Sequence, residues 1–71
     1  MNVLVLGSGG REHSICDNIK KSKKLTNLWC IPGNPGISEI AKCLSLNLSN
    51  NKMILDFCVK KKIDLVIPGS E

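Results

Sequence analysis

Four short apolar runs recur along the chain, separated by segments of mixed character. Residues 2–6 (NVLVL) and 63–67 (IDLVI) are nearly continuous runs closed by glycine or proline, which is typical of strands buried on both faces. Residues 27–31 (NLWCI) stop at the sequence PGNPG, which breaks regular structure. Residues 43–48 (CLSLNL) alternate apolar and polar positions, as a strand with one exposed face does. The pattern therefore predicts four strands.

Apolar residues at helical spacing predict two helices between these strands, over residues 12–22 and 51–62. A third segment, 37–42, is long enough for one or two helical turns. Ser49 or Asn50 can cap the helix over 51–62, because their side chains accept hydrogen bonds from the first helical turn. The side chains expected to face inward from that helix are Met53, Ile54, Phe57 and Cys58.

Strands that alternate with helices indicate an α/β fold, here a Rossmann-like open parallel sheet of about four strands with flanking helices and right-handed crossovers. If the strand order is 3-2-1-4, the first and fourth strands are neighbours. Ligands bind such sheets at the carboxyl ends of the strands, at the point where the order reverses. We therefore expect the loops GSGGREH, PGNPG and PGSE, which follow the first, second and fourth strands, to line one crevice.

The chain has 71 residues and a formal net charge of +4. This length corresponds to one domain or part of one. Most of the excess positive charge lies in two lysine clusters, within 20–24 and 60–62, at the predicted helix C-termini on the edge opposite the glycine loop. Cations there complement the helix dipole, so we expect a solvated role. A basic nucleic-acid-binding module is an alternative, but the only aromatics, Trp29 and Phe57, are not interleaved with the basic residues.

The chain contains four cysteines and no Cys-x-x-Cys pair, so the spacing of a metal site is absent. All four lie among apolar neighbours in or beside predicted helices and strands. We therefore expect buried or half-buried reduced thiols in a cytoplasmic protein. No apolar run approaches the ~20 residues that span a bilayer, and we expect neither a secretory signal nor a membrane segment. The cysteines are Cys16, Cys30, Cys43 and Cys58.

The loop GSGG joins a strand end to a helix start, a place where free N–H groups and the helix dipole attract anions. A phosphate is the expected anion, and a tight turn without any ligand is the alternative. The dinucleotide fingerprint G-x-G-x-x-G is only half matched, because Glu12 stands at the third glycine position. The second strand ends in Ile31-Pro32 without the acidic residue that holds a ribose. The loop therefore fits a phosphate monoester better than NAD.

GSGGREH after the first strand, PGNPG after the second and Gly-x-Glu after the fourth together resemble the N-terminal domain of the phosphoribosylamine–glycine ligase family, also called glycinamide ribonucleotide synthetases. The resemblance covers all 71 residues but only the first part of a much longer enzyme. On this resemblance, residues 1–71 are an incomplete N-terminal phosphoribosylamine-binding domain, without the ATP-grasp and C-terminal domains. One departure stands out, because Ser70 replaces the proline that the family usually shows before the glutamate.

The resemblance implies an ATP-dependent ligase that joins glycine to 5-phosphoribosylamine in de novo purine synthesis. ATP would phosphorylate the glycine carboxylate, and the sugar amine would attack the acyl phosphate. ATP, glycine and Mg²⁺ or Mn²⁺ would be bound by regions that this chain lacks, so the chain alone is expected to be inactive and to bind none of these cofactors. Its expected partner is 5-phosphoribosylamine, with neither nucleic acid nor membrane.

The resemblance also implies a set of substrate contacts and no catalytic or metal-binding residue. Backbone N–H groups from Ser8 to Arg11 would receive the 5′-phosphate, with the Arg11 guanidinium as a charge-assisted contact. Glu71 would accept hydrogen bonds from the ribose hydroxyls or the amine. For Arg11, a surface salt bridge stays open as the alternative. For Glu12, His13 and Asn34, purely structural roles stay open. The expected substrate-binding residues are Ser8, Gly9, Gly10, Arg11, Glu12, His13, Asn34, Gly69, Ser70 and Glu71.

Two further alternatives share the fold. One is the dinucleotide-binding module of a dehydrogenase, against which Glu12 and the missing acidic residue argue. The other is the N-terminal domain of another purine-pathway ATP-grasp enzyme, such as a carboxylase or a formyltransferase. The Arg-Glu-His that follows the glycine loop argues against it.

Overall fold

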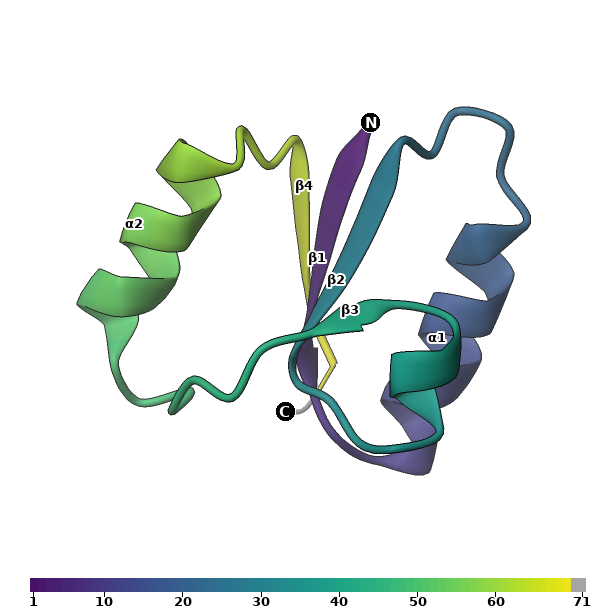
Figure 1. Ribbon diagram of the computed structural model, residues 1–71, viewed down its shortest axis with the longest axis horizontal. Helices are drawn as coiled ribbons and strands as arrows, with labels where there is room; N and C mark the ends of the chain where they lie inside the picture. The colour runs from purple at the N-terminus through teal and green to yellow at the C-terminus, as the bar shows by residue number, and fades with distance from the viewer. Residues whose placement is uncertain (70–71) are drawn as a thin grey trace.

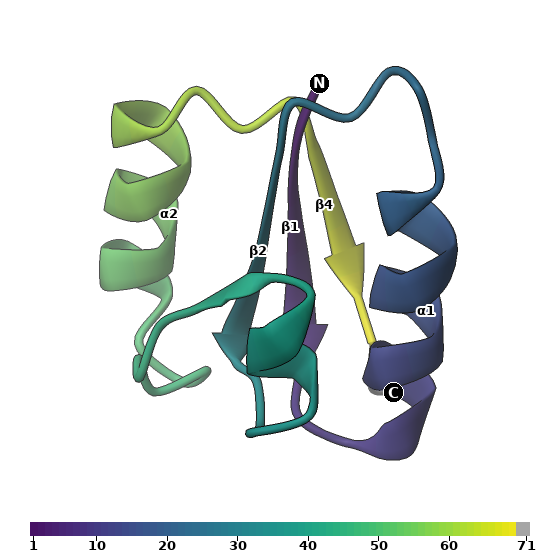
Figure 2. The same cartoon turned by 45° about the vertical axis from the view of Figure 1, so that its right-hand side comes forward.

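The structure, a computed structural model, describes residues 1–69. Four parallel strands form one sheet, which confirms the predicted α/β Rossmann-like fold. Their order is β3-β2-β1-β4, the order under which the first and fourth strands are neighbours. Figure 1 shows the helices α1 and α2 on opposite faces of this sheet, and Figure 2 shows the same layers after a 45° turn. The elements are β1 (Asn2–Gly7), α1 (Gly10–Lys20), β2 (Asn27–Pro32), the 3₁₀ turn η1 (Ile37–Glu39), β3 (Lys42–Cys43), α2 (Asn51–Lys60) and β4 (Leu65–Pro68).

The central strand β1 carries the core on both of its faces. Leu4 and Val5 have no exposed surface, although they point to opposite sides of the sheet. On the α1 side the buried cluster is Val3, Val5, Cys16, Leu28, Cys30 and Ile37. On the α2 side it is Leu4, Trp29, Ile31 and Phe57. The continuous apolar run in β1 is thus explained by one helix layer on each face.

Strand β3 is much shorter than the strand predicted over 43–48, and that prediction is wrong. Only Lys42 and Cys43 pair with β2. Residues of a parallel strand bond alternately to its two neighbours, and Cys30 bonds toward β3 by accepting from the N–H of Leu44. The next residue of β2 that faces β3 is Pro32, which has no N–H, so the ladder stops. Beyond it, Leu44 packs on the α2-side core without strand pairing.

Helix α1 begins two residues earlier than the predicted 12–22 and ends at Lys20. Gly9 is its N-cap, with an extended backbone, and Glu12 is the third helical residue. The Glu12 carboxylate accepts a hydrogen bond from the Gly9 N–H, which is half of a capping box. Because of this interaction the helix starts inside the glycine loop. The sequence-based prediction places the start later because it relies on the apolar residues, which begin further along the helix.

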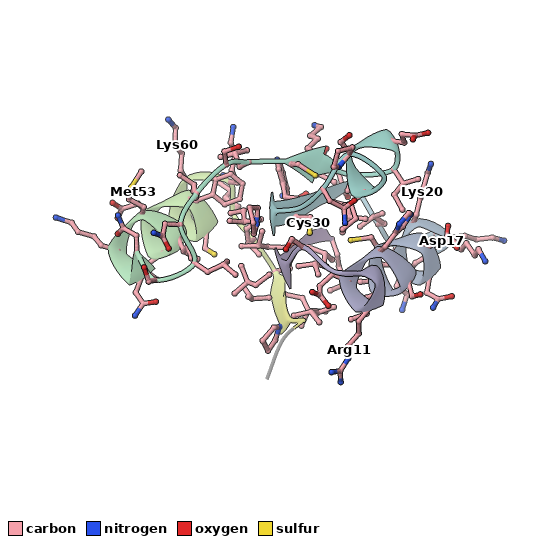
Figure 3. The ribbon with its side chains drawn as sticks, turned by 90° about the horizontal axis from the view of Figure 1, so that it is seen from below. Arg11, Asp17, Lys20, Cys30, Met53 and Lys60 are labelled. Carbon is pink, nitrogen blue, oxygen red and sulfur yellow. The ribbon has the colours of Figure 1, made fainter. Side chains whose placement is uncertain are left out.

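Helix α2 is capped by Asn50, one of the two predicted caps, whose side-chain oxygen accepts from the Met53 N–H at 3.2 Å. Phe57 is the buried residue of α2 and packs edge-on against Trp29, with ring centroids 5.6 Å apart. This contact sets the rotation of the helix. Met53, predicted to face inward, is 48% exposed and points away from the sheet in Figure 3, so that prediction is wrong.

The end of α2 forms a Schellman motif that the sequence did not reveal. The N–H of Ile63 bonds to the Cys58 carbonyl and the N–H of Lys62 bonds to the Val59 carbonyl. Lys62 occupies the position where glycine is usual, with φ of +53°. The helix therefore ends at Lys60 rather than 62. Ile63 serves the cap, and β4 starts at Leu65 rather than at the predicted residue 63.

The two lysine clusters lie at the C-terminal ends of the helices, as expected. Lys20 is in the last turn of α1 and Lys60 is in the last turn of α2. Both side chains are exposed, and both stand where a cation complements the carbonyl end of the helix dipole.

The left-handed conformation of Lys62 generates a first prediction. Replacing Lys62 with glycine removes the steric cost of a side chain at positive φ and should stabilise the chain by about 0.5–1 kcal/mol. The matched control is Lys60→Gly, two residues earlier within α2, which should destabilise by about 1 kcal/mol. Urea denaturation followed by the fluorescence of Trp29 measures both. Equal destabilisation by the two substitutions would contradict the motif.

Candidate functional site

Three loops are joined at the carboxyl end of β1. The Gly7 carbonyl accepts a hydrogen bond from the Gly33 N–H at 3.1 Å, which attaches the loop after β2. The Leu6 carbonyl accepts from the Gly69 N–H at 2.8 Å, which attaches the loop after β4. The predicted meeting of GSGG, PGNPG and the loop after β4 at one sheet edge is thus confirmed for residues 1–69.

Asn34 is the side chain that ties the loop after β2 to the glycine loop. Its amide nitrogen donates to the Ser8 carbonyl at 2.6 Å, and its amide oxygen accepts from the Ile37 N–H at 2.8 Å. The second bond starts the turn η1. Gly33, beside it, has φ of +71°, a conformation that favours glycine. The sequence indicated Asn34 as a turn residue, and the structure adds a bridge between two loops.

The glycine loop presents its backbone to solvent. Gly7, with φ of +137°, turns the chain out of β1, and Ser8, Gly9 and Gly10 are exposed. Gly10 opens α1, and N–H groups in the first turn of a helix have no acceptor within it. The loop therefore has the geometry of an anion site at a helix N-terminus.

Glu12 lies beneath this loop and is the one buried charged residue among residues 1–69, with 6% of its surface exposed. Its Oε1 accepts from the Gly9 N–H at 3.0 Å. A Cβ atom added to either Gly7 or Gly69 would clash with the Glu12 side chain. The carboxylate therefore fills a space between the ends of β1 and β4 that only two glycines leave open. A glutamate three residues after the N-cap is the sequence signal for this role.

Arg11 and His13 leave the helix start in different directions. Figure 3 shows the Arg11 side chain extending away from the sheet, and the residue is exposed. His13 is half-buried and lies against the loop after β2, where a Cβ atom on Gly36 would come within 3.1 Å of its Cε1. His13 thus adds a packing contact between α1 and PGNPG. The predicted Ser70 and Glu71 lie outside the described residues.

The whole chain, residues 1–71, matches a protein family described as "Phosphoribosylglycinamide synthetase, N domain". The chain belongs to this family. Similar curated proteins include "Phosphoribosylamine--glycine ligase" of Mesorhizobium japonicum, with 49% identity over 71 residues, and those of Rhizobium meliloti and Caldanaerobacter subterraneus, with 46% and 38%. All of the chain is covered in each case, but it spans only 17% of the length of these relatives.

The family membership confirms the resemblance drawn from the loop motifs. The loops of this chain conform only in part to a dinucleotide fingerprint. Neither the glutamate at the third glycine position nor the Ile31-Pro32 end of β2 suits a dinucleotide. The relatives of this chain carry the name of a ligase.

The four cysteines are free thiols, as expected, and one of them, Cys30, contacts the end of β1. Cys30 is fully buried, and its Sγ donates to the Gly7 carbonyl at 3.3 Å. Burial, with a smaller contribution from neighbouring Cys16, raises the pKa of Cys30 to about 12. Burial likewise raises the pKa of Cys16 and of Cys58. Figure 3 shows Cys30 between the sheet and α1, away from solvent.

Three further findings concern residues 1–69 rather than this edge alone. No group of three or more His, Cys, Asp or Glu side chains in this range is placed to hold a metal ion. No helix in the same range is long and apolar enough to cross a membrane. An apolar hollow of about 170 Å³ lies at the opposite end of the sheet from the glycine loop, without the convergent polar groups of a ligand site. Its lining is Met1, Val3, Ile19, Ser22, Lys24, Leu25 and Leu65.

The bridge made by Asn34 generates a second prediction. Asn34→Ala removes both hydrogen bonds and leaves the Ile37 N–H without that acceptor, which should cost about 1–2 kcal/mol of stability. Hydrogen exchange of the Ile37 amide should become faster. Asn18→Ala, at an exposed position of α1, is the matched control and should leave that exchange rate unchanged. Unchanged exchange in Asn34→Ala would show that the side chain does not fix the loop.

The raised pKa of Cys30 generates a third prediction. Burial raises the pKa of the folded Cys30 thiol to about 12, from the ordinary thiol value of 9.0 that we take for the unfolded chain. Folding then binds a proton, so stability falls as pH rises between these values. The advantage of the wild-type chain over Cys30→Ala should narrow by about 1.4 kcal/mol between roughly pH 7.5 and pH 10. Denaturation curves at both pH values test this, and a constant difference would contradict it.

Proposed function

We propose that this chain is the N-terminal part of an ATP-dependent ligase that joins glycine to 5-phosphoribosylamine to give glycinamide ribonucleotide in purine biosynthesis. Within that enzyme, residues 1–71 hold the phosphoribosyl substrate. Family membership over the whole chain supports the first statement. The observation that carries the second is the junction of three loops at the carboxyl end of β1, where open α/β sheets bind ligands.

The 5′-phosphate of the substrate binds at the start of α1 in this proposal. Ser8 and Gly10 offer exposed backbone, and Arg11 offers a guanidinium for a charge-assisted contact. Gly9 contributes less, since its N–H already donates to Glu12. The ribose and its amine lie toward the loop after β4, where Gly69, Ser70 and Glu71 follow the strand, and His13 and Asn34 close the opposite side of the crevice.

The role of this segment is positioning rather than chemistry. In this proposal ATP, Mg²⁺ or Mn²⁺ and glycine are assigned to the remainder of the enzyme, so the segment alone is expected to be inactive. The buried Cys30 is a protonated thiol at neutral pH and is not offered as a nucleophile. Holding one reactant in a fixed orientation lowers the barrier of a reaction between two bound substrates. Four free thiols fit a cytoplasmic location.

A titration tests the binding role as a fourth prediction. Ribose 5-phosphate, a stable stand-in for the amine, should shift the ¹⁵N–¹H resonances of Gly9, Gly10 and Arg11, while NAD should not. Arg11→Gln should weaken binding by about tenfold through the lost charge-assisted contact. Lys23→Gln, at the opposite edge of the sheet, is the matched control and should bind as the wild type does.

Two outcomes would contradict the binding role. Shifts with NAD alone would favour a dinucleotide-binding module. A folded chain that responds to neither compound would mean that these loops do not carry the site. Equal weakening by Arg11→Gln and Lys23→Gln would show general attraction of anions to a basic chain instead of a defined phosphate contact.

A further inference from the structure

Glu12 stands at the third glycine position of the dinucleotide fingerprint, so it is the residue at which this loop departs from that fingerprint. In a dinucleotide-binding loop the second glycine lets the backbone approach the pyrophosphate, and the third lets the helix pack closely on the strand. Here Gly9 stands at the second position and Glu12 at the third. Only 6% of the surface of Glu12 is exposed, so its side chain lies in the interior of the loop.

The carboxylate of Glu12 binds the glycine loop in the way that a bound anion would, by accepting a hydrogen bond from its backbone. Its Oε1 accepts from the Gly9 N–H at 3.0 Å, the backbone group that a pyrophosphate would approach. It also lies at the N-terminus of α1, where the helix dipole favours negative charge. The chain therefore supplies its own anion on the inner side of the loop.

The same side chain fills the space between the ends of β1 and β4. Gly7 and Gly69 approach it so closely that a Cβ atom on either would clash with it. Gly69 is held there by its N–H bond to the Leu6 carbonyl. A ligand is thus restricted to the outer, solvent-facing side of the loop, where Ser8 and Gly10 are exposed.

We propose that Glu12 is a specificity-determining positioning residue, whose buried carboxylate closes the inner side of the glycine loop to a pyrophosphate and leaves the outer side for a single sugar phosphate. The carboxylate does this by repelling a second phosphate group and by filling its place. Glu12 acts on the ligand through the loop and does not itself contact the bound sugar phosphate. This inference rests on the proposed phosphoribosyl site and names the residue that restricts it to a monoester.

The test compares the dissociation constants of NAD and ribose 5-phosphate for four chains, the wild type, Glu12→Gln, Glu12→Gly and the control Glu39→Gln. Glu39 is an exposed acidic residue of η1, so its substitution removes the same charge from the surface. Glu12→Gln keeps the shape and an acceptor for Gly9 but removes the charge, and Glu12→Gly also opens the space. The ratio of the NAD constant to the ribose 5-phosphate constant should fall at least tenfold in both Glu12 variants and stay unchanged in Glu39→Gln.

An unchanged ratio in Glu12→Gln and Glu12→Gly would overturn the inference, even if both ligands bound more weakly, because a purely structural role weakens both alike. If Glu12→Gly does not fold, Glu12→Gln decides the question alone. Failure of the wild type to bind ribose 5-phosphate would contradict the proposed function instead. In that case NAD binding gained by the Glu12 variants would still support the inference, and NAD binding by none of the four chains would overturn it.

Discussion

The carboxyl end of β1 is the constraint on which the rest of the site depends. Two consecutive carbonyls, those of Leu6 and Gly7, receive the N–H groups of Gly69 and Gly33. Each bond brings in a loop from a neighbouring strand, so three segments far apart in sequence end at one point. The arrangement requires β1 to lie between β2 and β4, which the parallel order β3-β2-β1-β4 provides. A strand order that separated β1 from β4 would move the loop after β4 away from this point.

The two sides of the sheet are not equally well covered. On the α1 side, Cys16 and Ile37 have no exposed surface. Helix α2 rests mainly on the edge-to-face contact between Phe57 and Trp29, and its outer face carries the exposed residue Val59. The glycine loop leads directly into α1, the better-packed helix. The candidate site is therefore built on the more completely buried half of the molecule, which favours a fixed loop geometry.

Most of the fold followed from the sequence because each strand is a short apolar run with a clear stop, and because parallel sheets obey strict connection rules. The errors have physical causes that only pairing or packing reveals. The strand predicted over 43–48 ends early because Pro32, on the neighbouring strand, faces it without an N–H. Met53 is exposed because the Phe57–Trp29 contact fixes the rotation of α2. In both cases the cause involves a residue of β2, outside the segment whose structure was predicted incorrectly.

The site residues also divide into those that the sequence identifies and those whose role only the structure reveals. The loop glycines and Asn34 were identified from motif and turn chemistry, but the partners of Asn34 depend on tertiary geometry. Glu12 shows why a motif mismatch can be informative. At the sequence level it is only a missing third glycine, whereas in the structure it is a buried carboxylate that fits because Gly7 and Gly69 lack side chains. The carboxylate takes up one N–H group of the glycine loop and, in return, fixes the shape of the loop between the ends of β1 and β4.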